Sequence, residues 1–382
     1  MASKQTSAPW RVGVLFSQSG LTSVSEQAQL RGTLVAIDEI NSRGGIDGRP
    51  VEPVVYDPGS DAATYVQYAK KLMIEDSVTT IFGGYTSSCR KAILPVVERL
   101  NGLLWYSAPY EGFEFSQNVI CTGTTLNQNC IGLCRYLMRK FGKRFYFVGN
   151  DYIYPRVANQ VMRDLVISSG GTVLGERYLN MKPSRSYFPE LMKDIQKAQP
   201  DVIFSTMVGE STSFFYQAYH DAGFDPGLTP IASLTTSEPE LKAMGYDVGE
   251  GHITAATYFE SLNSDSNKDF LALYHHRYGR DEPVDMCLEA AFFQVNLWAR
   301  ALAATNTQDP RLLRSAVLGS DINAPQGNVA INPTYGHADL WSRIGRANHR
   351  GQFDVVYESD GCIASDPYMI SYGRSLANIN PD

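Results

Sequence analysis

The chain has 382 residues, of which 43% are hydrophobic and 19% charged, and its formal net charge is −7. This length is enough for two or three domains, each with its own core. The acidic balance argues against direct nucleic-acid binding, which needs clustered Lys and Arg. No apolar run approaches the ~20 residues of a membrane-spanning helix, so we expect no membrane insertion.

Strand and helix signals alternate from the start of the chain. Short β-branched or aromatic runs predict strands, and apolar residues at helical spacing predict helices. The predicted order is strand 11–16, helix 27–41, strand 51–56, helix 62–75, strand 78–82, a helix ending at Leu100, and strand 103–106. This alternation implies right-handed crossovers and therefore a parallel sheet.

A second series of the same kind begins near Ile120. Its elements are helix 127–141, strand 144–149, helix 154–169, strand 172–179, helix 188–198, strand 201–206, a helix ending at Ala222, and strand 230–234. The last part is strand 254–258, helices 266–278, 284–304 and 310–319, and a strand-like tail over 329–372. Because the first series is short of helices, we expect the chain to cross between two lobes more than once, so that these late helices complete the first lobe.

The stretch 79–118 has the strongest pattern for a binding site. One strand ends at a glycine pair followed by Tyr85 and Ser87, and the next strand runs into 107–110, which reads SAPY. In an open α/β sheet, ligands bind beyond the carboxyl ends of the strands. Two neighbouring strand ends that present hydroxyls and tyrosines favour a small, polar, uncharged ligand. The alternative is that these residues cap helices and pack in the core.

Four charged residues accompany these two turns. Arg90 and Lys91 begin the helix after the first turn, and Glu111 and Glu114 follow the second. An acid in this position would suit a cationic ligand. The interpretation that we favour is that all four contact solvent, the hinge or the opposite lobe.

Motifs for catalysis, metals and cofactors are missing from the sequence. The six histidines are scattered, and neither a nucleophile elbow, a zinc-protease motif nor a phosphate-binding glycine loop occurs. The six cysteines form no C-x-x-C, and only Cys130 and Cys134 share a helix face. We therefore expect no catalytic residue, no metal and no cofactor, and we expect buried free thiols in a reducing compartment.

Several longer stretches resemble a known family. They are GVLFSQSG, INSRGGIDGRPVEPVVYDPGSD, RKAILPVVERLNGLLWY, PYEGFE, NDYIYPR, FSTMVG, PIASLTTSE and NAPQGNVAI. They are similar to the type I periplasmic-binding-protein superfamily, in its branch of short-chain amide and urea binding proteins. Within that branch the chain most resembles the AmiC-like cytoplasmic amide sensors, from about Val12 to Tyr368.

The resemblance implies an α/β fold of two doubly wound parallel-sheet lobes joined by a three-strand hinge. The first lobe would comprise 10–120 plus 256–330, and the second 121–255 plus 331–382. The ligand would lie between strand ends of both lobes, which close on it. Binding and closure would then be a single event.

The resemblance also implies a set of ligand-binding residues. They are Tyr85, Ser87, Tyr106, Tyr152, Tyr154 and Thr235. The chain departs from the family pattern in one place, because the position of a family threonine is occupied by Ala108. Either Ser107 supplies the missing hydroxyl from one position away, or the pocket takes a different small ligand.

The function that the resemblance implies is non-catalytic binding of an acetamide-like short amide or urea. The protein would act as a negative regulator of an amidase operon, as a homodimer, through an RNA-binding antiterminator partner. The alternative is the substrate-binding receptor of an amide or urea ABC transporter. The first ten residues, MASKQTSAPW, have no apolar signal-peptide core, which favours the cytoplasm, unless this start replaces a removed export signal and the protein is periplasmic.

Overall fold

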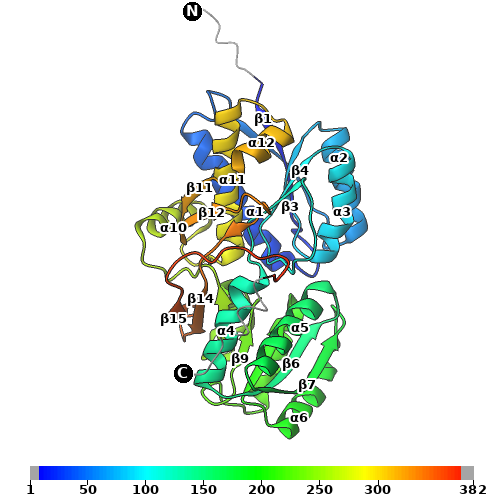
Figure 1. The fold of residues 1–382 in the computed structure, drawn as a ribbon, viewed down its shortest axis with the longest axis vertical. Helices are drawn as coiled ribbons and strands as arrows, with labels where there is room; N and C mark the ends of the chain where they lie inside the picture. Colours follow the sequence, from blue (N-terminus) through cyan, green and yellow to red (C-terminus); the bar gives the residue numbers. More distant parts are fainter. Residues whose placement is uncertain (1–7, 371–382) are drawn as a thin grey trace, which may run out of the picture.

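A computed structural model describes residues 8–370 of the chain. Figure 1 shows two α/β lobes stacked along the long axis of the molecule. The upper lobe contains the N-terminal elements together with the late helices, and the lower lobe contains the middle of the chain. Each lobe has its own sheet and its own apolar core. The α/β class and the two lobes predicted from the sequence are confirmed.

The first lobe is built on a five-stranded parallel sheet in the order β2-β1-β3-β4-β5. Its strands are β1 (Trp10–Leu15), β2 (Val51–Tyr56), β3 (Thr80–Gly83), β4 (Leu103–Tyr106) and β5 (Val119–Cys121). Its early helices are α1 (Ser23–Ser42), α2 (Ala62–Ile74) and α3 (Ser87–Arg99). The strand β5 was not predicted, because three residues are too few for a periodic signal.

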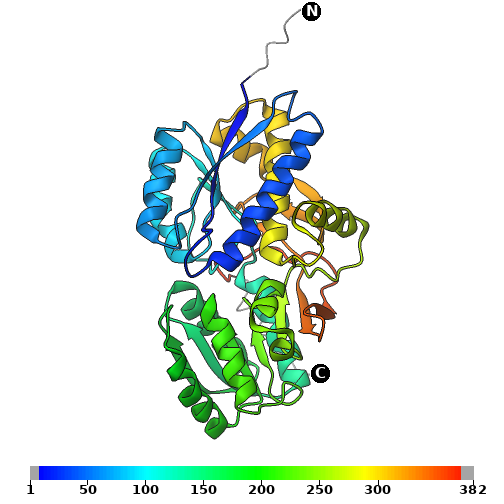
Figure 2. The same ribbon diagram turned by 180° about the vertical axis from the view of Figure 1, so that it is seen from behind.

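Three late helices complete the first lobe. They are α10 (Asp265–Tyr278), α11 (Met286–Thr305) and α12 (Pro310–Val317). Figure 2 shows α1 and α11 lying side by side on one face of the sheet, with α2 and α3 on the other. The helix α11 is buried along most of its length, with Phe292 and Trp298 in the same core as Val12 and Ile81. Such an apolar helix needs a sheet to cover, as predicted.

The second lobe is built on a seven-stranded sheet in the order β15-β14-β10-β9-β8-β6-β7. Its strands are β6 (Arg144–Asn150), β7 (Thr172–Leu179), β8 (Val202–Thr206), β9 (Ile231–Ser233), β10 (Ile253–Ala256), β14 (Arg343–Ala347) and β15 (Phe353–Glu358). Its helices are α4 (Leu126–Lys140), α5 (Ile153–Ser168), α6 (Phe188–Ala198), α7 (Glu210–Asp221), α8 (Glu238–Met244) and α9 (Tyr246–Gly249). The strands from β6 to β10 are parallel, and β14 and β15 add an antiparallel edge. Separate cores lie under α4 and α5 on one face and under α6 and α7 on the other.

The chain passes between the lobes after β5, after β10 and again before β14. A small antiparallel sheet of β11 (Asp321–Ala324), β12 (Gly327–Ile331) and β13 (Ala338–Asp339) precedes the last crossing. Its last strand is adjacent to the first crossing, where the backbones of Cys121 and His337 form an isolated parallel β-bridge. We therefore propose the lobe boundaries expected from the sequence, with the last one moved from 330 to about 340. Residues 371–382 of the expected second lobe lie outside the described range.

Within residues 8–370, no helix combines the length and the apolar composition that crossing a bilayer requires. Five of the six cysteines are buried free thiols, as predicted. The sixth, Cys362, is exposed, so that part of the prediction was wrong. It lies in the segment after β15, on the surface of the molecule and outside the three cores.

Candidate functional site

The first wall of the site is the turn between β3 and α3. Gly84 has φ +83°, a left-handed conformation that favours glycine, and it turns the chain at the end of the strand. The side chain of Thr86 accepts a hydrogen bond from the backbone N–H of Cys89 and so caps α3. This cap holds Tyr85 and Ser87 just beyond the carboxyl end of β3.

The opposite wall comes from the second lobe. Tyr152 occupies the N-cap position of α5, directly after β6, and Tyr154 lies in the first turn of that helix. Thr235 follows β9, and its hydroxyl donates to the carbonyl oxygen of Met207 at 2.7 Å. These residues therefore also lie beyond the carboxyl ends of parallel strands, as the general rule for open α/β sheets requires.

The two walls enclose a small cavity between the lobes. Its lining residues are Tyr85, Ser87, Ala108, Pro109, Tyr152, Tyr154, Val208 and Thr235. The space open to the centres of water molecules is about 10 Å³. A cavity of this size holds about one water molecule. The lobes are thus closed, and a ligand of more than a few atoms requires them to separate.

Five of the seven residues predicted to bind ligand line the cavity, and two, Tyr106 and Ser107, do not. The hydroxyl of Tyr106 donates to the carbonyl oxygen of Tyr85 at 2.5 Å, so it supports the first wall from behind. The hydroxyl of Ser107 accepts a hydrogen bond of 2.8 Å from the side chain of Gln29. Ala108, the next residue along the chain, lines the cavity instead.

Two wall residues, Pro109 and Val208, were missed by the sequence interpretation. Each follows the carboxyl end of a strand, Pro109 in the first lobe and Val208 in the second, so the rule for open α/β sheets applies to both. Neither side chain has a donor or acceptor, so a pattern of polar side chains does not identify them. Val208 is held by its backbone N–H, which donates to the side-chain oxygen of Asn150 at 2.8 Å.

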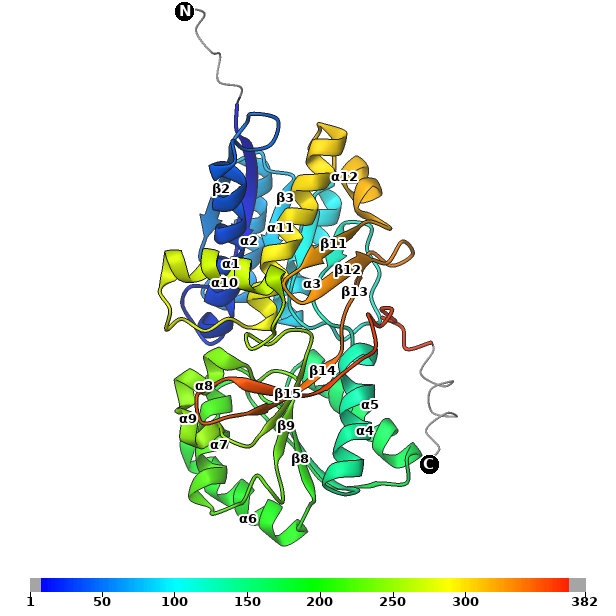
Figure 3. The ribbon, with the colours of Figure 1, turned by 90° about the vertical axis from the view of Figure 1, so that its left-hand side faces the viewer.

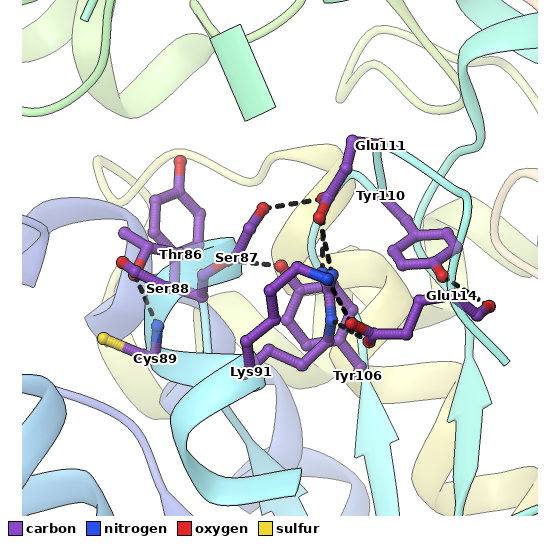
Figure 4. Close-up of polar contacts among 11 residues, drawn as sticks. Thr86, Ser87, Ser88, Cys89, Lys91, Tyr106, Tyr110, Glu111 and Glu114 are labelled. Carbon is purple, nitrogen blue, oxygen red and sulfur yellow. Dashed lines mark hydrogen bonds and ion pairs between the residues drawn. The ribbon is translucent and has the colours of Figure 1, made fainter. Parts of the chain in front are cut away.

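A buried ion pair lies directly behind Ser87. The hydroxyl of Ser87 donates to the Glu111 carboxylate at 2.6 Å, and Arg90 donates to the same carboxylate at 2.7 Å (Figure 4). Arg90 also contacts Glu114 at 3.1 Å, and Lys91 pairs with that second acid. The side chains of Arg90 and Glu111 are 0% and 2% exposed. Of the contacts expected for these two residues, with solvent, the hinge or the opposite lobe, contact with solvent is therefore wrong, and each charge is compensated by the other in the interior.

The hydroxyls of the cavity have a defined hydrogen-bond polarity. A carboxylate and a backbone carbonyl can only accept, so Ser87 and Thr235 have each committed their single proton to a protein partner. Towards the cavity both therefore present acceptors. The hydroxyl of Tyr154, which is 3% exposed, has no hydrogen-bond partner in the protein. It is free to donate to a bound molecule.

The tyrosines of the wall are neutral. Burial raises the pKa of Tyr85, Tyr152 and Tyr154 far above the ordinary value, since a phenolate would lose its hydration. They consequently keep their protons at any physiological pH. The cavity thus offers neutral donors and acceptors, and the charges of Arg90 and Glu111 are paired behind its first wall.

Other hollows of the molecule are larger but lie on the surface. The groove between α6 and α7 has a volume of about 580 Å³ and is lined by residues such as Arg185, Phe214 and Met244 from a single lobe. It receives no strand ends, and none of the predicted site residues borders it. Among the residues from 8 to 370, no three His, Cys, Asp or Glu side chains are placed to hold a metal ion.

Similarity to known proteins extends over most of the chain. A stretch of 135 residues is 28% identical to a limonene hydroxylase of Geobacillus stearothermophilus and covers 35% of this chain but only 25% of that protein. The Leu/Ile/Val-binding protein homolog 7 of Brucella melitensis is 24% identical over 291 residues, which are 72% of each protein.

A solved structure has the same fold. It is the solute binding protein of an ABC transporter from Rhodopseudomonas palustris HaA2, in complex with p-hydroxybenzoic acid. It matches with a TM-score of 0.86 at 23% identity and covers 96% of this chain and 100% of that chain. The periplasmic binding protein domain family matches residues 10–374, almost the whole sequence, and the chain belongs to this family.

Proposed function

We propose that this protein is the substrate-binding receptor of an ABC transporter and that its ligand is a short primary amide or urea. The observation that carries the ligand assignment is the hydrogen-bond polarity of the interlobe cavity. Ser87 and Thr235 present acceptors, and Tyr154 presents an unpaired hydroxyl. An amide group has the complementary pattern, with two N–H donors on one side and a carbonyl acceptor on the other.

The same polarity disfavours carboxylates. A carboxylate has only acceptors, so it would face the oxygens of Ser87 and Thr235 without a proton between them. An unpaired buried polar group costs about 1–3 kcal/mol, and more when it is charged. The p-hydroxybenzoic acid of the Rhodopseudomonas palustris protein and a free amino acid both carry a carboxylate. Neither therefore suits this site.

Cavity size supports the same ligand class. The closed cavity holds about one water molecule and is lined by Pro109, Val208 and three tyrosines, so a larger ligand requires a wider separation of the lobes. Acetamide has about four heavy atoms, and at about −1.5 kcal/mol per atom its binding free energy cannot exceed roughly −6 kcal/mol. The dissociation constant can then be no lower than the order of tens of micromolar. A substituted benzene ring would need much wider separation of the lobes.

The transport role is supported by the relatives rather than by the site. The matched Rhodopseudomonas palustris protein is a solute binding protein of an ABC transporter, and the Brucella relative is named for amino-acid binding. Neither supports the cytoplasmic amidase regulator, its RNA-binding antiterminator partner or the homodimer that the resemblance implied. A receptor of this kind works in the periplasm, which we propose as the location. We also propose that the protein binds its ligand without catalysis, in keeping with a family of binding proteins.

Calorimetry tests the ligand class. We expect heat of binding with acetamide, propionamide and urea, and none with acetate, p-hydroxybenzoate or leucine. Acetate is the sharpest control because it has nearly the shape of acetamide. Tighter binding of acetate than of acetamide would contradict the assigned polarity.

Cell fractionation and growth test the transport role. We expect the native protein in the periplasmic fraction, and we expect deletion of its gene to slow growth on the amide at low concentration. Cytoplasmic recovery with the native start, together with altered amidase expression on deletion, would identify the regulator instead.

A further inference from the structure

Two carboxyl groups meet across the lobe interface beside the cavity. Glu240 belongs to α8 of the second lobe, and Asp285 caps α11 of the first lobe. The hydroxyl of Ser25 donates to Glu240 at 2.9 Å, and the hydroxyl of Ser237 contacts both acids, with 3.1 Å to Asp285. Figure 3 shows α8 at the top of the lower lobe, facing α1 and α10 of the upper lobe. Two hydrogen bonds of this cluster therefore exist only while the lobes are closed.

The cluster is one proton short when both acids are ionised. The hydroxyl of Ser237 has a single proton, yet its oxygen lies within hydrogen-bond distance of a carboxylate oxygen of Glu240 and of one of Asp285. One proton can satisfy only one of these contacts. The other contact becomes a hydrogen bond only if one of the two acids is protonated and donates to the serine oxygen. Geometry alone thus calls for a neutral acid in the closed form.

No cation compensates the pair. Glu240 and Asp285 are 5% and 2% exposed, and among the described residues neither has a Lys, Arg or His nitrogen within salt-bridge distance. Titratable groups lie on all the surrounding elements. Those of the first lobe and the crossing after β10 are Cys287 and Glu289 on α11, Tyr274 and His275 on α10, Arg31 on α1, Tyr85 after β3, and Tyr258 and Glu260 on the crossing. Those of the second lobe are Glu238 and Lys242 on α8 and Tyr216 on α7. Two cations of these elements, Lys242 and Arg31, both pair with Glu282. The groups within the cluster are acids and hydroxyls.

We propose that closure of the lobes over the ligand takes up one proton, which Glu240, Ser237 and Asp285 share, so that mild acidity strengthens ligand binding. This inference rests on the proposed function, because it describes regulation of the same interlobe site. The link to the cavity runs through Tyr85, which lines the cavity and interacts with Ser25, the residue that donates to Glu240.

The sign and size of the effect follow from linkage. In the closed form, burial and then the charge of Asp285 raise the pKa of Glu240 to about 7. Opening exposes α8 to water and returns this pKa towards the ordinary 4.5. The closed form therefore binds more protons between these two values, and affinity increases as pH falls through that window. Between about pH 7.5 and about pH 5.5 the expected gain in affinity is roughly twentyfold.

The experiment measures acetamide affinity by calorimetry at both pH values in the wild type and in Glu240→Gln. The amide supplies the donor that the cluster lacks, so the variant should bind at the higher pH as tightly as the wild type binds at the lower pH, without pH dependence. Asp285→Asn is the second variant, because asparagine keeps the helix cap. The matched control is Glu190→Gln, an exposed acid on α6, which should keep the wild-type pH dependence.

A second readout does not depend on the ligand. Small-angle scattering of the ligand-free protein should show a larger closed fraction at the lower pH, and this shift should disappear in Glu240→Gln. Acetamide binding with pH-independent affinity in the wild type would overturn the proton inference and leave the proposed function intact. Failure of every amide and urea to bind, with pH-dependent compaction still present, would overturn the function and leave the inference intact. Affinity that still depends on pH in both Glu240→Gln and Asp285→Asn would also refute the proton inference.

Discussion

Substitution of Tyr154 by phenylalanine should have opposite effects on the free and the bound protein. The Tyr154 hydroxyl is buried at the cavity and has no partner in the protein. Phenylalanine keeps the ring and its packing and removes only this oxygen. An unsatisfied buried hydroxyl costs about 1–3 kcal/mol, so Tyr154→Phe should stabilise the ligand-free protein by up to that amount. For a lobe of this size the melting temperature should rise by roughly 2–4 °C per kcal/mol.

The effect on ligand binding should have the opposite sign. If Tyr154 donates to the ligand carbonyl, its loss removes one hydrogen bond worth about 1–1.5 kcal/mol. The dissociation constant for acetamide should then increase about tenfold. Calorimetry gives the affinity, and thermal unfolding followed by circular dichroism gives the stability of the same preparations.

Tyr146 provides a matched control for this pair of measurements. Its hydroxyl is also buried and unpartnered, but it packs in the core under α6 and α7, away from the cavity. Tyr146→Phe should therefore stabilise the protein without changing the affinity. An unchanged affinity in Tyr154→Phe would refute the assignment of this hydroxyl to the ligand. A loss of stability in both variants would refute the assumption that the oxygens are unsatisfied.

The remaining predictions concern the first wall and the surface. Ser87→Ala should weaken acetamide binding about tenfold, because it removes an acceptor from the cavity. Ser88→Ala, at the exposed neighbouring position, should leave the affinity unchanged. Equal affinities of the two variants by calorimetry would mean that Ser87 does not contact the ligand. Glu111→Gln should lower the free energy of unfolding in guanidinium chloride by up to about 3–5 kcal/mol, because it removes the acid that lies nearest to the buried Arg90. The exposed Glu98→Gln should have little effect, and similar values for both variants would contradict a buried pair. A thiol reagent should label Cys362 alone in the native protein, and rapid labelling of more than one thiol would contradict the burial of the other five.

Much of the fold could be predicted because its signals are local. The strands 51–56, 103–106 and 172–179 and the helix 188–198 have the predicted bounds, since each is a periodic run between turn residues. The misses are short. The strand β5 and the helix α9 contain too few residues to show a period, and they are defined by neighbours from distant parts of the chain.

The candidate site was predicted in part for the same reason. The turn residues Tyr85, Ser87, Tyr152, Tyr154 and Thr235 follow strands, and strand ends can be located from sequence. The direction of a side chain at such an end is not local information.

The sequence by itself determined the two α/β series, the position of their polar strand ends and the neutral character of the wall, because these depend on residue type and short-range periodicity. Only the tertiary structure decided which hydroxyls remain available. In the folded chain the hydroxyl of Tyr106 donates to a backbone carbonyl oxygen, and the hydroxyl of Ser107 accepts from Gln29. Ala108 is the residue that faces the cavity. The tertiary structure also buries the two acids that meet across the lobes. Hydrogen-bond partners and burial are set by residues far apart in the chain, and no local pattern records them.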